Sequence, residues 1–284
     1  MIHFLLALLA GVAHAAAIAS PWNGQPQWWL QLLALGALVS LLHGERRPLR
    51  GFATGAVFAT AWLTATWWWL FISLHTYGGL PAPLAVIAVV GLAAFLGLYY
   101  AAAAAVYSAV AASSGRWAFV AFAALWAFGE LLRVWAFTGF PWGAAGYAHL
   151  DGPLAGYAPW TGVHGMSFLA ALVAAGLASV LRHRLAAVLA VAVLGLGLAL
   201  PLAGPFTTSS GRVGVTLLQG NIPQDEKFQP GSGIPMALDW YGRQLEEATT
   251  ALVVAPETAI PLLPRQLPEG YLEAISKRYS SGSQ

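Results

Sequence analysis

Long apolar stretches separated by short polar turns dominate the first two hundred residues. A helix that crosses a bilayer needs about 20 mainly apolar residues, because its backbone groups find no partners in lipid. The pattern predicts seven such spans, at roughly 3–19, 27–43, 51–73, 84–112, 117–135, 162–181 and 185–203. The stretch 51–115 contains no charged residue, and the sequence GGLPAP at 78–83 predicts a turn between two helices within it.

A different pattern begins at Arg212. The segment 213–217 alternates like a strand, and residues 235–250 combine apolar and charged positions in the period of an amphipathic helix. A second short apolar run ends at Glu257, between two prolines, and 268–279 predicts another helix. Strand, helix, strand, helix is the opening of an α/β layer. We therefore expect a transmembrane domain at 1–205 and the first part of an α/β domain at 212–284.

Composition agrees with this division. Hydrophobic residues make up 58% of the chain and charged residues 8%, against about 25% charged residues in soluble domains. Ten charged residues lie in the first 211 positions and fourteen in the last 73.

A net charge of +2 without a basic run gives no indication of nucleic-acid binding. The apolar N-terminus lacks a Lys/Arg region, which favours a retained first span over a cleaved signal peptide.

The loop arginines predict the orientation. Alternate loops between the predicted spans contain Arg46, Arg47, Arg50, Arg116, Arg182 and Arg184. The other loops, near 20–26, 74–83 and 136–161, contain neither Lys nor Arg. The positive-inside rule places the arginine loops and the N-terminus in the cytoplasm. Seven spans then deliver residues 212–284 to the extracytoplasmic face.

Two features of the membrane segment could carry chemistry. Glu130 and Arg133 lie three apart on one predicted span, so they can face the same side of the helix. Ionisable residues at membrane depth indicate function, although both could instead reach the outer interface and only fix the helix. The loop 137–165 is long and contains His149 and His164. The histidine spacing matches no metal motif, and cysteine is absent, so we predict no metal site and no cofactor.

Five segments resemble one family. They are WWWLFISLHTYGGLP at 67–81, WAFGELLR at 126–133, TGFPWGAAGYAHLDGPLAGYAPWTGVHGMSFL at 138–169, QGNIPQDEKF at 219–228 and PETAIP at 256–261. In this order they resemble the bacterial apolipoprotein N-acyltransferases, polytopic inner-membrane enzymes with an extracytoplasmic nitrilase-type (carbon–nitrogen hydrolase) domain. The resemblance spans nearly the whole chain and implies a helical membrane domain followed by the start of an α/β nitrilase-type sandwich.

The resemblance also implies a reaction and its residues. A Glu-Lys-Cys triad in this family moves an acyl chain from a phospholipid, through a Cys thioester, to the N-terminal amine of a diacylglyceryl-apolipoprotein. Glu257 matches the Glu, the general base, and we expect a sheltered position for it. The Lys, the Cys and a closing transmembrane helix would lie beyond residue 284, so we expect these 284 residues alone to be inactive. Phe228 stands where the family usually has a lipid-contacting Trp.

Two other classes of function remain open on the sequence. A transporter would contain spans broken by Gly or Pro, with buried charges near mid-membrane and internal repeats. Only Glu130 and Arg133 approach that pattern, and no repeat is visible. A non-catalytic membrane scaffold with a decayed nitrilase domain would fit the absence of cysteine. The acyl-transfer hypothesis is favoured because it accounts for the motifs on both sides of residue 205.

Overall fold

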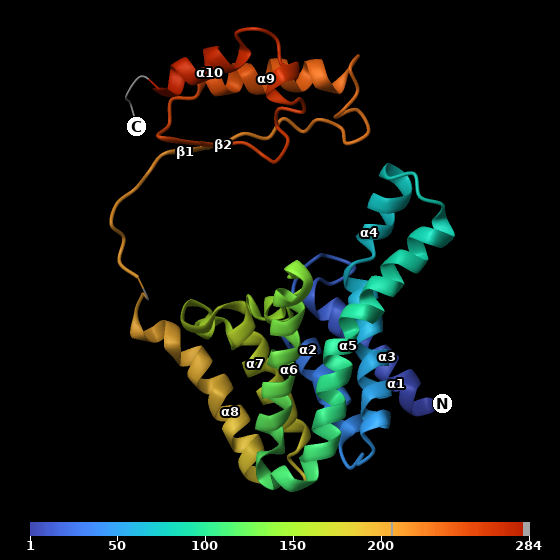
Figure 1. The fold of residues 1–284 in the computed structure, drawn as a ribbon. Helices are drawn as coiled ribbons and strands as arrows, with labels where there is room; N and C mark the ends of the chain where they lie inside the picture. The colour runs from blue at the N-terminus through green and yellow to red at the C-terminus, as the bar shows by residue number, and fades with distance from the viewer. Residues whose placement is uncertain (206, 281–284) are drawn as a thin grey trace. The chain divides into compact units, whose positions relative to one another are not determined.

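The computed structural model describes residues 1–205 and 207–280, so the last four positions of the predicted second domain lie outside it. The chain divides into two compact units, Met1–Phe206 and Thr207–Gln284. Unit 1 is built from helices, and unit 2 contains the two strands (Figure 1).

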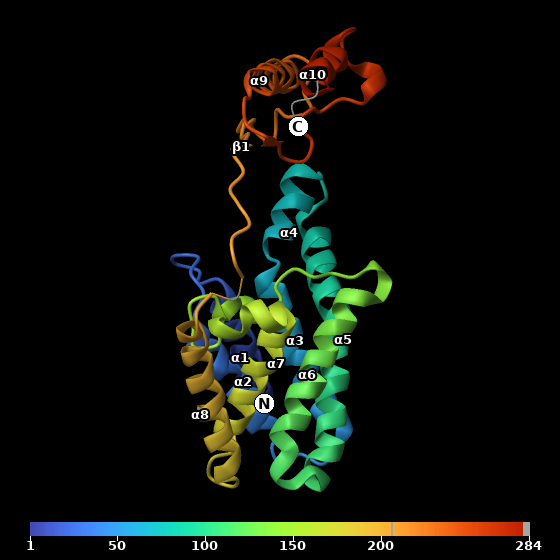
Figure 2. The ribbon, with the colours of Figure 1, turned by 90° about the vertical axis from the view of Figure 1, so that its left-hand side faces the viewer.

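The main helices of unit 1 are α1 (Ile2–Ile18), α2 (Trp28–Leu42), α3 (Pro48–Thr66), α5 (Ala82–Ser114), α6 (Ala118–Trp135), α7 (Ala158–Ala178) and α8 (Arg184–Ala199). Shorter helical pieces connect them: α4 (Trp69–Ile72), a π-helix (Ser73–Tyr77) and 3-10 turns at Gly115–Trp117, Ala136–Thr138, Ala145–His149, Ala155–Tyr157 and Leu200–Ala203. Helix α3 packs between α1 and α5, and α6 joins α5 to α7 (Figure 2). Helix α7 in turn contacts α2 and α8.

The helices are held together by aromatic rings and by close backbone approach. The Tyr100 ring centroid lies 5.0 Å from that of Trp62 and 4.8 Å from that of Trp126, and all three side chains are buried. A Cβ atom added at Gly51 would lie 2.2 Å from Ser108 Oγ, and one at Gly55 would lie 2.6 Å from an alanine methyl on α5. Small residues thus let α3 and α5 approach closely, as is common between membrane helices.

Fewer helices than predicted satisfy the length requirement for a span. Among the described residues, four are long and apolar enough to cross a membrane: Ala82–Ala111, Gly115–Thr138, Ala155–Ala178 and Arg184–Ala203. Pro48–Thr66 and Trp69–Tyr77 make a fifth if this pair, bent by 55°, is one span. Helices α1 and α2 have 17 and 15 residues, about 26 and 22 Å at 1.5 Å per residue. Both lengths are below the roughly 30 Å of a bilayer core. The count of seven spans therefore stays a prediction.

The third predicted span, 51–73, is broken in the structure at a tertiary contact. Helix α3 ends at Thr66, where the Trp67 side chain is fully buried and its Nε1 donates to the carbonyl of Trp142 at 3.2 Å. A tertiary contact with a distant loop therefore accompanies the break, and no such contact can be seen in the local apolar pattern.

Unit 2 contains the predicted order of strand, helix, strand and helix. Strands β1 (Val215–Leu217) and β2 (Leu252–Val254) pair in parallel, with Thr216 opposite Val253. Helix α9 (Gly233–Glu247) connects them, and α10 (Tyr271–Ser280) packs on α9 after a 3-10 turn at Pro264–Gln266. Leu218, Ala237 and Tyr241 form a small buried core. A parallel pair joined through a helix is the unit from which α/β folds are built, but the nitrilase assignment stays a prediction.

Candidate functional site

The parallel pairing of β1 and β2 brings two of the family-like motifs to one edge of the sheet. Gln219–Asn221 follow β1, and Pro256–Thr258 follow β2. The carboxyl ends of parallel strands are the usual place for ligand sites in α/β folds. Both segments line a cavity of about 180 Å³. Its lining consists of Gln219, Asn221, Ile222, Lys227, Ala237, Tyr241, Pro256, Thr258 and Ala259.

Lys227 connects the predicted site residues. Its Nζ donates to the main-chain oxygen of Glu257 at 3.3 Å and lies 6.0 Å from the centroid of the Phe228 ring. The Glu257 side chain is exposed, and so is Phe228, at 58%. The structure thus places both residues near one lysine. The sheltered position expected for Glu257 is absent among the described residues, because its side chain is exposed.

Helix α9 fixes the turn after β1. The main-chain N–H of Gly220 donates to the Tyr241 hydroxyl at 3.0 Å. A Cβ atom at Gly220 would lie 3.0 Å from that oxygen and from the Trp240 ring. Asn221 and Thr258, one after each strand, have φ values of 50° and 55°, a conformation uncommon for residues other than glycine. Both turns therefore have backbones that tertiary contacts must hold. The sequence pattern predicted Tyr241 on a helix, but it did not predict that the Tyr241 hydroxyl accepts a hydrogen bond from Gly220.

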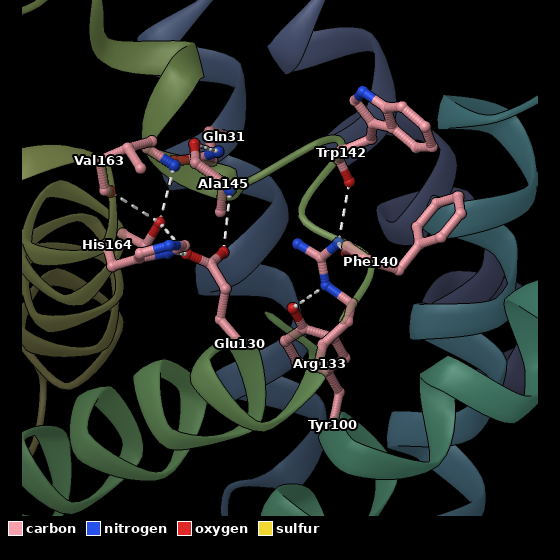
Figure 3. Close-up of polar contacts among 11 residues, drawn as sticks. Gln31, Tyr100, Glu130, Arg133, Phe140, Trp142, Ala145, Val163 and His164 are labelled. Atoms are coloured by element: carbon pink, nitrogen blue, oxygen red, sulfur yellow. Dashed lines mark hydrogen bonds and ion pairs between the residues drawn. The ribbon is translucent and has the colours of Figure 1, made fainter. Parts of the chain in front are cut away.

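A second candidate site is the buried polar network of unit 1, drawn in Figure 3. Glu130 on α6 is fully buried. Its Oε2 accepts from the Ala145 N–H at 2.9 Å, and its Oε1 accepts from Ser167 Oγ at 2.7 Å. Oε1 also lies 2.7 Å from His164 Nδ1. The carboxylate is thus compensated by three polar partners, as a buried charge requires.

Arg133, one turn further along α6, is also fully buried but points to other partners (Figure 3). Its Nε donates to the Tyr100 hydroxyl at 3.1 Å, and its Nη1 donates to the carbonyls of Phe140 and Trp142 at 2.5 and 2.8 Å. Neither charged group extends to solvent, because both side chains are buried. Each instead binds the main chain of the loop 137–165, so their bonds fix that loop on α6.

His149 completes the attachment of the loop. Its Nε2 lies 2.9 Å from Gln31 Oε1, while Gln31 Nε2 donates to the Ala145 carbonyl at 2.6 Å. Because the amide nitrogen is committed to Ala145, the amide oxygen accepts and His149 Nε2 carries the proton. Burial lowers the pKa of His149 to about 4. No group of three or more potential metal ligands occurs in the part of the chain that the structure describes.

Sequence reasoning did not single out Gln31, Tyr100 or Ser167. Each lies in a mainly apolar helix, and only Ser167 falls within one of the family-like segments, 138–169. The only available signal was a polar residue within a predicted span, where the cost of burial requires a partner.

Comparison with known proteins places this geometry in a family. The family model for the apolipoprotein N-acyltransferase N-terminal domain matches residues 7–176, well over half of the chain. This chain belongs to the apolipoprotein N-acyltransferase family. The matched region includes Glu130, Arg133 and the loop that they hold.

Relatives named apolipoprotein N-acyltransferase match nearly the whole chain. One from Verminephrobacter eiseniae is 49% identical over 98% of this chain and 55% of its own length. One from Ralstonia nicotianae is 42% identical over 95% and 52%, and one from Chromobacterium violaceum is 40% identical over 97% and 53%. The chain thus spans about half the length of these bacterial relatives. Family membership and the apolar helices indicate a bacterial membrane protein.

Proposed function

We propose that this chain provides the membrane unit and the first strands and helices of the catalytic unit of an apolipoprotein N-acyltransferase. The enzyme would transfer an acyl chain from a phospholipid to the N-terminal amine of the diacylglyceryl-modified Cys of an apolipoprotein. The observation that carries the proposal is that Lys227 and the residues on either side of Gly220 and of Glu257 line one cavity at the carboxyl ends of β1 and β2. Two motifs more than thirty residues apart in the sequence thus meet at one place.

In this proposal Glu257 is the general base. Its carboxylate takes the proton from a Cys thiol, and the thiolate sulfur attacks the ester carbonyl carbon of the phospholipid. The lysophospholipid alcohol leaves with the proton. The amine of the acceptor then attacks the thioester carbonyl carbon, the C–S bond breaks, and the amide forms as the Cys leaves as a thiol with the proton from the amine. Such acyl transfer needs a nucleophile, a base and an oxyanion stabiliser. The 284 residues contain no Cys, so the nucleophile would lie in the part of the relatives that this chain does not span.

Phe228 is proposed to contact lipid. Its ring is exposed beside Lys227, on the segment that also lines the cavity. An aromatic ring offers a large apolar surface at little entropic cost, which suits the edge of a site that receives an acyl chain.

The membrane arrangement is proposed to follow from the arginines. The turns α2–α3, α5–α6 and α7–α8 lie at the same end of unit 1 (Figure 2), and all six loop arginines lie in these turns or in the first helical turn that follows them. This end would face the cytoplasm of the inner membrane, and seven spans would place residues 212–284 on the extracytoplasmic side.

The alternatives are less well supported. The two buried charges that a transporter would use are both committed to hydrogen bonds with the loop 137–165. A non-catalytic scaffold predicts that Glu257 can be changed without effect, and this is open to experiment.

The experiment joins this chain in frame to the remaining part of the Verminephrobacter eiseniae relative. The purified fusion is incubated with phospholipid and a diacylated lipopeptide, and triacylated product is measured by mass. Glu257→Gln keeps the size of the side chain but removes the basic carboxylate, so thioester formation should fall by about 10²–10⁴-fold. Glu269→Gln, at another exposed carboxylate of unit 2, should leave the rate unchanged. Near-normal thioester formation by Glu257→Gln would make Glu257 an ordinary turn residue.

A further inference from the structure

A separate cavity, of about 340 Å³, lies at the arginine-bearing end of unit 1. Helices α5 and α6, the turn between α2 and α3, and the residue before α8 all contribute to it. Its lining consists of His43, Gly44, Glu45, Arg46, Tyr107, Ser108, Ala111, Gly115, Ala118 and His183. The network around Glu130 uses none of these residues.

The charge around this cavity is strongly positive. Its end of the unit carries six arginines and, among the described residues, one carboxylate, Glu45. Glu45 is already engaged, because its Oε1 accepts from the Arg47 N–H at 2.9 Å and its Oε2 lies 3.5 Å from Arg50 Nη1. Burial, followed by the nearby positive charges of Arg182 and His183, lowers the pKa of His43. The cavity thus has a surplus of positive charge that a bound anion would relieve.

Ser108 gives a second, independent indication of a ligand. It lines the cavity, its side chain is 1% exposed, and its hydroxyl has no hydrogen-bond partner among the described residues. Gly51 faces it across the α3–α5 contact, where a Cβ atom would lie 2.2 Å from Ser108 Oγ. Buried hydroxyls without a partner are rare in folded proteins. Rotation about χ1 of Ser108 would turn this hydroxyl away from Gly51 toward the cavity that the residue lines, where an acceptor oxygen would satisfy it.

We propose that this cavity binds a phosphate group, supplied either by the headgroup of an anionic phospholipid or by free phosphate. Guanidinium groups recognise phosphate oxygens through charge-assisted hydrogen bonds. Arg46 and Arg182 would neutralise the anion, and Ser108 would donate one hydrogen bond to it. Basic pockets between membrane helices, at the level of the headgroups, are suited to anionic lipids. The proposal does not depend on the acyl-transfer reaction.

The test uses the 284-residue chain in detergent. Native mass spectrometry measures how much phosphatidylglycerol or phosphatidylcholine the protein retains at equal lipid concentration. The wild type should retain one phosphatidylglycerol in preference to phosphatidylcholine. Arg46→Gln/Arg182→Gln should reduce that retention by about tenfold or more, since each lost charge-assisted contact is worth about that factor. The control Arg212→Gln/Arg265→Gln makes the same charge change at exposed positions of unit 2 and should retain lipid normally.

Two further variants, and a measurement of thermal unfolding with inorganic phosphate, complete the test. Glu45→Gln removes the one carboxylate at the cavity and should increase retention, while Ser108→Ala should reduce it; neither change alters an arginine. A rise in melting temperature with inorganic phosphate, seen in the wild type but not in Arg46→Gln/Arg182→Gln, would support the site with free phosphate as its ligand. The proposal is overturned if both lipids are retained equally and phosphate has no effect, or if the double variant and Ser108→Ala bind like the wild type.

Discussion

Removal of the Glu130 carboxylate should destabilise unit 1 chiefly through one main-chain group. In Glu130→Ala, the Ser167 hydroxyl keeps a second acceptor, the Val163 carbonyl at 3.1 Å. The His164 side chain is 32% exposed, so water can replace its partner. The Ala145 N–H is different, because that residue is fully buried and its donor bond goes to Glu130. The cost therefore falls mainly on Ala145 and the loop that contains it.

The expected loss in free energy of unfolding follows from the size of each lost interaction. A buried N–H left without a partner costs about 1–3 kcal/mol, and a hydrogen bond to a charged group contributes about 1.5–3 kcal/mol. Side-chain hydrogen bonds between membrane helices average only about 0.6 kcal/mol, and loss of the carboxylate also removes its desolvation cost. We therefore expect about 3 kcal/mol for Glu130→Ala, below the sum of three bonds. Glu130→Gln should cost about 1 kcal/mol, because the amide oxygen can accept from Ala145 while the NH₂ group donates to Ser167.

The assay is reversible unfolding in detergent, combined with limited chymotrypsin digestion of the aromatic loop 137–165. Glu130→Ala should lower the free energy of unfolding and speed cleavage in the loop, while Asp151→Ala, at an exposed carboxylate of the same loop, should stay within about 0.5 kcal/mol of wild type. In a double-mutant cycle, Ser167→Ala should cost less when Glu130 is already Ala. A Glu130→Ala protein as stable as wild type, or a larger loss for Gln than for Ala, would refute the reasoning.

Three further predictions concern pH, backbone strain and topology. The pKa of His149 is about 4 in the folded chain against 6.5 ordinarily, so the unfolded state binds more protons between these values. The free energy of unfolding should fall by about 3 kcal/mol in total from pH 6.5 to 4. The His149→Gln variant should not show this contribution to the pH dependence of stability. Gly139→Ala should cost more than Gly44→Ala in thermal unfolding: both have φ near +80°, but only at 139 would the Cβ atom clash, 1.8 Å from a carbonyl oxygen. Reporters fused after position 205 and at Arg47 should report opposite sides of the membrane; a cytoplasmic signal from the first would contradict the orientation.

Local sequence patterns were sufficient for much of the secondary structure. The apolar runs predicted α5, α6, α7 and α8 close to their observed positions, because a continuous helix of about 20 apolar residues needs no information from elsewhere. In unit 2, the alternation before Gln219 and the amphipathic period over 235–250 predicted β1 and α9 for the same reason. The motifs also indicated the family, which the comparisons show.

Tertiary contacts decided what the residues do. Glu130 and Arg133 share a helix face, yet they hold different parts of one loop, because their partners come from α5, α7 and the loop itself. The break after Thr66 is accompanied by the contact of Trp67 with the carbonyl of Trp142, and the apolar pattern does not record this. The sequence determined which chemical groups the chain possesses and the elements that carry them. Which groups meet depends on contacts between residues far apart in the chain, and only the folded structure sets those contacts.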